Sequence, residues 1–260
     1  MTILTAESDA AATPPDVLAV GLNAVLQKTL VLPAFTPHAV NRAEAMHLSA
    51  GGKGTHCALA ANRMRPGCCM LALFTGGANG EVVRAQLADQ GMAQLDVAIA
   101  SQTRGCTTIV SRADRDMTEL VEPSPVVEPD AVERMRERVD SALTTVRAVA
   151  LCGTVPQGVD AGFYADIARR ARGHVLVVDA CRDIGPTLET GLVDVLKINR
   201  DEILELTGEG RVAAAAARLR RAYGIASVAV TAGGGAAEFH GTDGAWTCRL
   251  PPPPAPVVNP

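Results

Sequence analysis

Short, continuous apolar runs that alternate with segments of helical periodicity constrain this fold more than any other feature of the sequence. The runs predicted to be strands are Val17–Leu22, Met70–Phe74, Val146–Cys152, Val175–Asp179, Val193–Ile198 and Ser227–Thr231. Apolar runs without polar alternation are typical of strands that are covered on both faces. After Pro129, by contrast, apolar residues recur at about every 3.6 positions, which predicts an amphipathic helix. This alternation predicts an α/β fold, a three-layer sandwich around a mostly parallel central sheet.

Two stretches, Thr29–Leu48 and Thr103–Val121, do not follow this alternation of strands and helices. They combine β-branched residues, charges and, in the first, prolines without helical periodicity. They are either loops or the strands of a small sheet set apart from the main one. Near the end, Ala245–Leu250 is predicted to be an edge strand that runs into the stiff, extended segment Pro251–Pro254.

Composition and charge exclude several classes of partner. The chain has 260 residues, of which 24 are basic and 28 acidic, for a net charge of −4. This near balance argues against nucleic acid or an anionic membrane as the main partner. No apolar run reaches the ~18 residues that a membrane helix needs, so we expect no membrane association.

The N-terminus and the cysteines indicate a cytoplasmic protein. Residues 1–16 are predicted to form a flexible tail, since Met1–Pro15 lacks both the basic start and the apolar stretch of a signal peptide. The seven cysteines are odd in number and include no C-x-x-C pair. A zinc site or a disulfide framework is therefore not expected, and a reducing compartment suits the chain better.

A glycine-rich loop, Ala50–Gly54, precedes a predicted helix that includes Cys57–Met64. Its glycines allow backbone N–H groups to approach a ligand, and Lys53 adds a positive charge at a helix N-terminus. The spacing is not that of a Walker A loop. The alternative interpretation is a mobile turn with a solvated lysine.

Three further segments follow strands and have both functional and structural interpretations. Thr75–Gly80, with Asp96 downstream, has a spacing unlike the dinucleotide-binding pattern and favours a simple tight turn. Asn199 and Glu202 could organise a hydrated magnesium ion, or could form a capping box at the start of a helix. Thr231–Gly235 could approach a nucleotide, although a hairpin turn is the simpler interpretation.

The order of these motifs resembles that of the pfkB family of carbohydrate kinases, and most closely its 1-phosphofructokinase and tagatose-6-phosphate kinase branch. The segments that carry the resemblance are Gly21–Asn23, Val40–Arg42, Ala50–Gly54, Thr103–Arg104, Cys152–Gly158, Lys197–Glu202 and Thr231–Gly235. The resemblance implies a ribokinase-like fold with a small β-sheet lid formed near residues 29–48 and 103–121. It also implies an ATP- and Mg²⁺-dependent kinase of a sugar or sugar phosphate, and allows a homodimer formed through the lid.

The resemblance also assigns residues to the two sides of the site. The predicted substrate-binding residues are Asn23, Gln27, Gly51, Gly52, Lys53, His56 and Arg104. The predicted nucleotide-side residues are Lys197, Asn199, Glu202, Thr231 and Gly233, with Glu202 holding the metal through water. Two positions depart from the family pattern, because Gln27 replaces the usual carboxylate and His56 replaces the usual asparagine.

The family's catalytic aspartate, in a G-x-G-D motif, would lie beyond Pro260, so residues 17–260 are predicted to be an incomplete kinase domain without turnover of their own. The alternatives are a non-catalytic protein that binds a sugar phosphate or a nucleotide, and a dinucleotide-dependent oxidoreductase built around Gly76–Gly80 and Asp96.

Overall fold

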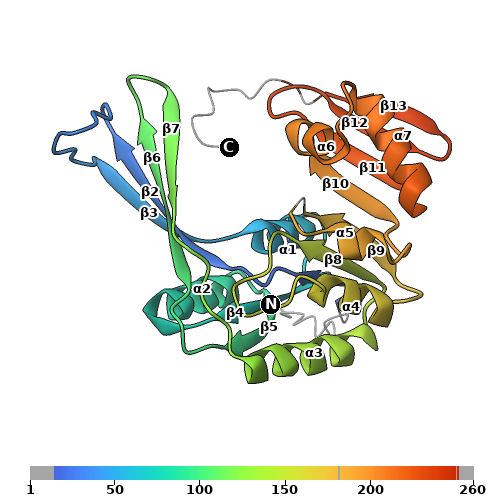
Figure 1. Ribbon diagram of the computed structural model, residues 1–260. Coiled ribbons are helices and arrows are strands. Elements are labelled where there is room, and N and C mark those ends of the chain that lie inside the picture. The colour runs from blue at the N-terminus through green and yellow to red at the C-terminus, as the bar shows by residue number, and fades with distance from the viewer. Residues whose placement is uncertain (1–14, 181, 250, 252–260) are drawn as a thin grey trace, which may run out of the picture.

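The computed structural model describes residues 15–180, 182–249 and 251, and its centre is a nine-stranded sheet (Figure 1). In spatial order its strands are β13 (Gly244–Cys248), β12 (Ala237–Gly241), β11 (Ser227–Thr231), β10 (Val195–Asn199), β9 (Val175–Asp179), β8 (Ala148–Cys152), β1 (Val17–Val20), β4 (Cys69–Thr75) and β5 (Ala93–Ala98). Neighbouring strands are parallel from β11 to β5, while β12 and β13 add an antiparallel hairpin at one edge. The predicted mostly parallel sheet is confirmed.

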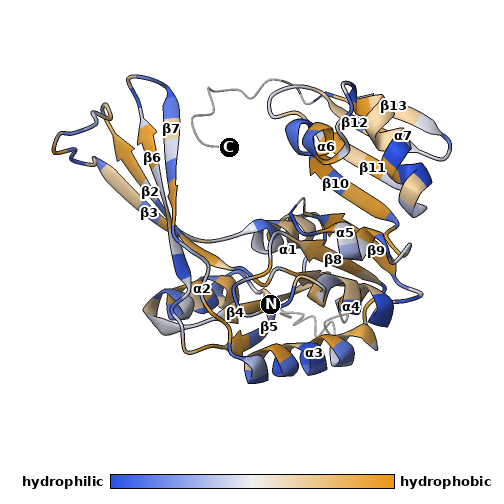
Figure 2. Ribbon diagram, in the orientation of Figure 1, coloured by the Kyte–Doolittle hydropathy of each residue, from blue (hydrophilic) through white to orange (hydrophobic). Residues whose placement is uncertain are grey.

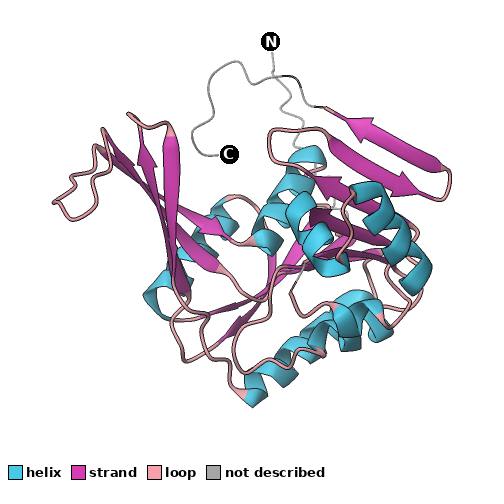
Figure 3. Ribbon diagram, turned by 45° about the horizontal axis from the view of Figure 1, so that its top comes forward, coloured by secondary structure: helices cyan, strands magenta, loops and turns pink. Residues whose placement is uncertain are grey.

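Helices cover the main sheet on both faces (Figure 3). They are α1 (Lys53–Met64), α2 (Gly77–Asp89), α3 (Pro129–Leu143), α4 (Phe163–Arg170), α5 (Gly185–Leu188), α6 (Arg200–Thr207) and α7 (Val212–Tyr223). The side chains of β1 show the two faces by their alternation. Leu18 and Val20 belong to the core under α3–α7, whereas Ala19 belongs to the core under α1 and α2. Figure 2 shows the expected apolar colouring along β9 and β10.

A second, four-stranded sheet projects from the main body and forms the lid (Figure 1). Its strands, in spatial order, are β3 (Ala45–Gly51), β2 (Val25–Leu32), β6 (Arg104–Ser111) and β7 (Asp116–Val121). The central pair, β2 and β6, is parallel, and the two outer pairs are antiparallel. The two irregular stretches of the sequence are therefore strands of a separate sheet rather than loops.

The most visible difference from the sequence prediction is β5, which was not expected. Gln94 and Asp96 interrupt its apolar run, and both are partly buried in the structure. The Asp96 carboxylate accepts a hydrogen bond from Thr75 Oγ1 at 2.6 Å and pairs with Arg84 Nη1 at 3.4 Å. A carboxylate engaged in this way stabilises the sheet edge, and nothing in its surroundings favours the dinucleotide alternative.

The predicted ends of the chain fall mostly outside the described residues, which exclude 1–14, Pro252–Pro254 and the Val257–Pro260 approach to the expected catalytic motif. Asp16, the last residue of the predicted tail, is held by the main sheet: its backbone N–H donates to the Cys68 carbonyl at 2.9 Å. None of the helices in the part of the chain that the structure describes has the length and hydrophobicity of a membrane span.

Candidate active site

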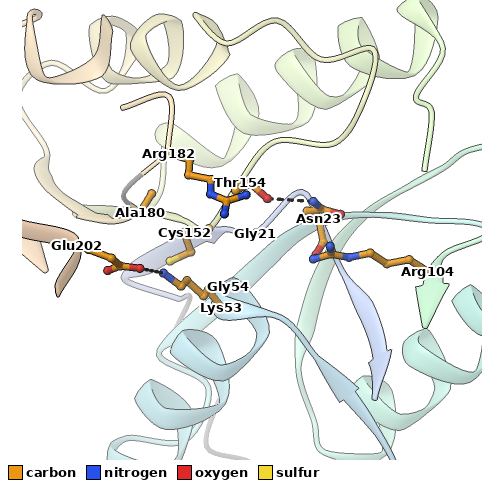
Figure 4. A pocket seen from close by; sticks show the side chains of 11 residues that line it. Gly21, Asn23, Lys53, Gly54, Arg104, Cys152, Thr154, Ala180, Arg182 and Glu202 are labelled. Carbon is orange, nitrogen blue, oxygen red and sulfur yellow. Dashed lines mark hydrogen bonds and ion pairs between the residues drawn. The ribbon is translucent and has the colours of Figure 1, made fainter. Parts of the chain in front are cut away.

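A cavity of about 310 Å³ opens at the carboxyl ends of the central strands, between the main sheet and the base of the lid (Figure 4). It is lined by Gly21, Asn23, Lys53, Gly54, Arg104, Cys152, Gly153, Thr154, Ala180, Arg182 and Glu202. Figure 4 shows Asn23 and Arg104 at one end of the cavity and Lys53 and Glu202 at the other. Ligands of open α/β sheets bind at this edge, so the cavity is the candidate active site.

The glycine-rich loop brings the start of α1 against the end of β1. Gly52 is the N-cap of α1 and has φ +107°, a conformation that favours glycine. Gly54 packs so closely that a Cβ there would lie 2.3 Å from Gly21 Cα. At Gly153 a Cβ would meet Lys53 Cβ at 3.5 Å. These close contacts argue against the mobile-turn alternative, because they make the loop a tightly packed joint that carries Lys53 at the cavity.

Two lysines and two carboxylates form a charged cluster at the rim. Lys53 Nζ lies 3.8 Å from Asp179 Oδ1 and 3.7 Å from Glu202 Oε1, while Lys197 Nζ lies 3.1 Å from the same Asp179 oxygen. The Lys53 side chain is 43% exposed, so each of its ion pairs contributes at most about 1 kcal/mol to stability. Such weak pairs can rearrange when a charged ligand enters.

Asn199 and Glu202 form the capping box at the start of α6. The Asn199 side chain accepts a hydrogen bond from the Glu202 backbone N–H at 2.8 Å, and Glu202 Oε2 accepts one from the Asn199 N–H at 3.0 Å. The structural interpretation of this pair is thus confirmed. The capping box uses Glu202 Oε2, while Oε1 of the same carboxylate lies 3.7 Å from Lys53 Nζ at the rim.

A second hollow, of about 360 Å³, lies beside the first at the ends of β10 and β11. It is lined by Asn199, Arg200, Asp201, Thr231, Ala232 and Gly233. The structure therefore brings together Asn199, Thr231 and Gly233, as predicted for the nucleotide side, and places Lys197 in the charged cluster. The predicted hairpin is also present, because β11 continues antiparallel into β12.

The lid end of the cavity contains two buried polar atoms that have no hydrogen-bond partner among the described residues, Arg104 Nε and Asn23 Oδ1. Asn23 is only 7% exposed, and its Nδ2 donates to Ser124 Oγ at 2.7 Å and Thr154 Oγ1 at 3.0 Å. Burial lowers the pKa of Arg104, but a guanidinium remains charged. An unpaired buried polar group costs about 1–3 kcal/mol, so this end of the cavity suits a ligand with both acceptors and hydroxyl donors.

Four of the predicted substrate residues lie outside the cavity lining. Gly51 and Gly52 flank Lys53 without lining the cavity, and Gln27 lies higher on the lid, where its amide donates to Thr108 Oγ1. His56 lines a separate hollow, together with Ser49 and Arg63 among others. The structure does not bring His56 to the cavity.

Comparison with known proteins identifies the family. The model of the pfkB family carbohydrate kinases matches residues 19–260. The chain belongs to the pfkB family. It is 30% identical to the 1-phosphofructokinase of Rhodobacter capsulatus over 251 residues, which are 92% of this chain and 77% of that protein. It is 26% identical to a tagatose-6-phosphate kinase of Staphylococcus epidermidis over 73% of this chain, and spans 62% of that protein's length. The predicted family resemblance and carbohydrate-kinase class are confirmed.

Solved structures of pfkB-type kinases have the same fold. The phosphofructokinase-2 of Escherichia coli in complex with fructose-6-phosphate matches with a TM-score of 0.84 at 22% identity, over 93% of this chain and 81% of that chain. The ribokinase of Giardia lamblia matches with a TM-score of 0.74 at 14% identity, over 91% and 76%. At these identities the likeness concerns the fold alone, and it confirms the predicted ribokinase-like architecture.

The sequence analysis missed several residues of the candidate site, among them Asp179, Arg182 and Thr154. Asp179 could have been found, because it ends an apolar strand at the sheet edge where ligands bind. Thr154 lies in the Cys152–Gly158 segment, which carried the resemblance but was assigned no role. Arg182 follows β9 in a loop that has no recognisable motif, so no signal in the sequence points to it.

Proposed function

We propose that the protein takes part in ATP-dependent phosphorylation of a hexose phosphate bound in the cavity. The observation that carries this proposal is the pair of unpartnered buried atoms, Arg104 Nε and Asn23 Oδ1. A phosphate oxygen is the acceptor that a guanidinium prefers, and a sugar hydroxyl is a donor for the asparagine oxygen. The names of two relatives, a 1-phosphofructokinase and a tagatose-6-phosphate kinase, agree with an acceptor of this class.

ATP and Mg²⁺ fit the residues on the other side of the rim. Glu202 offers a carboxylate, the type of hard oxygen ligand that holds magnesium through water, and Asn199 lies beside it. Thr231 and Gly233 line the adjacent hollow, where their backbone can approach phosphates. Bound Mg²⁺ supplies positive charge to the transferring phosphoryl group. Lys53 links both sides, since it lines the cavity and its ammonium lies 3.7 Å from Glu202 Oε1.

The proposed alternative is a protein that binds the same ligands without phosphoryl transfer. The neutral Gln27, at the position where the family pattern has a carboxylate, favours this alternative. The binding roles proposed for the cavity do not depend on the catalytic aspartate that the family resemblance predicts beyond Pro260. The cytoplasmic location stays a prediction.

Calorimetry with fructose 1-phosphate, fructose 6-phosphate, tagatose 6-phosphate and fructose tests the acceptor class. At least one hexose phosphate should bind about 10- to 100-fold more tightly than fructose, because charge-assisted hydrogen bonds contribute about 1.5–3 kcal/mol. Arg104→Met should remove this preference, while Arg112→Met, which changes an exposed lid arginine, should retain it. Equal binding of fructose and its phosphates would refute the proposed acceptor.

An ADP-release assay on the natural chain, including any segment that follows Pro260, separates the two candidate functions. Release of ADP that depends on the hexose phosphate supports the kinase. Binding of both ligands without ADP release supports the non-catalytic alternative.

We also propose that the lid forms a homodimer through its apolar face. The strand register places Met46, Leu30 and Ile109 in one row of this face. In the next row Leu48 and Leu120 lie on the outer strands, with Lys28 and Thr107 between them. Met46 is 57% and Leu120 56% exposed in the single chain. Large exposed apolar side chains on one face of a sheet mark an interaction surface, and a second lid offers a matching one.

A further inference from the structure

The opposite face of the lid contains a chain of hydrogen bonds that crosses three strands. Gln27 on β2 donates from Nε2 to Thr108 Oγ1 on β6, and the Thr108 hydroxyl lies 3.2 Å from Glu119 Oε1 on β7. Thr108 and Glu119 are directly opposite each other in the register, and Thr108 is fully buried. The chain therefore ends at a carboxylate on one side and at the Gln27 amide on the other.

The carboxylate determines the direction of every hydrogen bond in this chain. An ionised Glu119 can only accept, so the single hydroxyl proton of Thr108 is donated to it. The Thr108 oxygen can then only accept, so Gln27 must turn its NH₂ group toward it. The orientation of a glutamine amide is often ambiguous. Here it follows from the Glu119 carboxylate, which is two hydrogen bonds away from Gln27. The carbonyl oxygen of Gln27 is left as a hydrogen-bond acceptor.

The register shows that Gln27 faces the same side of the lid as Arg104. Val25 pairs with Arg104, and Gln27 pairs with Cys106, so these two pairs are successive positions on one face. Arg104 lines the cavity. Gln27 therefore lies one position beyond Arg104 on the same face of the lid, and it is partly exposed.

We propose that Thr108 and Glu119 are positioning residues that hold Gln27 as a neutral hydrogen-bond acceptor for a hydroxyl of the sugar. This inference rests on the proposed hexose-phosphate acceptor and deepens it, because it adds a requirement for a hydroxyl near the lid. A neutral amide can accept from this hydroxyl without the repulsion that a carboxylate would exert on a nearby phosphate. The enzyme thus combines a charged contact, Arg104, with an uncharged one beside it.

The test measures how strongly binding depends on each hydroxyl, with monodeoxy analogues of whichever hexose phosphate binds. In the parent protein, one deoxy analogue should bind about 3- to 10-fold more weakly, as expected for one neutral hydrogen bond. Glu119→Gln and Thr108→Val should each reduce this ratio toward one. Thr107→Val, which removes a hydroxyl from the opposite face of the same strand, should retain it.

A double-mutant cycle separates positioning from general damage to the lid. Gln27→Ala should abolish the hydroxyl preference, and adding Glu119→Gln should have no further effect, because Glu119 acts only through Gln27. Glu119 is exposed, so its replacement by glutamine should leave folding intact.

The outcomes distinguish this inference from the proposed function. If Glu119→Gln and Thr108→Val retain the parent's hydroxyl preference, the positioning inference is overturned while hexose-phosphate binding stands. If the parent binds no hexose phosphate, both the proposed function and this inference fail.

Discussion

Replacing Gly54 by alanine tests whether the glycine-rich loop is a packed joint rather than only a ligand loop. The added Cβ would lie 2.3 Å from Gly21 Cα and 3.0 Å from Gly21 N. Both are backbone atoms, so no rotamer change can relieve the contact, and the start of α1 must move away from the end of β1. Because Lys53 is the preceding residue, its ammonium would shift with the helix.

The expected cost follows from two opposing effects. Overpacking of a tight site costs about 1–3 kcal/mol, and a contact with backbone belongs at the upper end of that range. Alanine improves helix propensity over glycine by about 1 kcal/mol. The free energy of unfolding should therefore fall by about 2 kcal/mol, which for a domain of this size lowers Tm by about 4–8 °C.

Thermal unfolding of the variant, followed by circular dichroism, measures this change. Gly210→Ala is the matched control, because a Cβ there would meet no atom within 4 Å. The control should be neutral, or more stable by about 0.4–1 kcal/mol through the unfolded chain. A Gly54→Ala protein that melts with the parent would refute the packed-joint argument.

Three further predictions concern the rim, a thiol pair and the lid. Lys53→Met should weaken binding of ATP with Mg²⁺ at least about 10-fold in calorimetry while lowering stability by less than about 1 kcal/mol; unchanged affinity would remove Lys53 from the nucleotide side. A hydrogen bond from Cys152 lowers the pKa of the Cys57 thiol. Because the thiolate is the reactive form, alkylation of Cys57 by iodoacetamide should reach half its maximal rate at a lower pH than in a Cys152→Ala variant, and coincident profiles in mass spectrometry would contradict this. Leu120→Asp should convert the proposed dimer to monomers in sedimentation, and a parent that is already monomeric would rule out the lid interface.

How far the sequence predicts this structure depends on where each residue finds its partners. The bounds of β9 and β11 agree with the prediction, because a continuous apolar run is itself the signal. β5 could not be predicted in the same way, since the partners of Asp96 lie on other elements, at Thr75 and Arg84. A polar residue within a strand is interpretable only when its partner is known.

In the candidate site, too, some features follow from the sequence and others depend on distant partners. Motif order placed Lys53 and Arg104 at the cavity, but it could not orient α1 about its own axis. The contact between Gly54 and Gly21 sets that orientation. His56 is two residues after Gly54, about 200° around the helix from the position that packs on Gly21, and it lines a separate hollow. The motif supplies the residue types that can bind a ligand, whereas packing between distant segments determines which of their side chains face the cavity.

Asn23 also connects the lid to the main sheet through the hydrogen bonds of its side chain. It lies in the connection from β1 into the lid, and Ser124, to which its Nδ2 donates, lies in the connection from β7 back to α3. The same nitrogen donates to Thr154, which follows β8 of the main sheet. The Asn23 side chain therefore links the two segments that connect the lid to the rest of the chain, and links both to Thr154 beside the main sheet. A rotation of the lid about these segments would stretch the hydrogen bonds of Asn23, so binding of a ligand by Asn23 would be coupled to the angle of the lid.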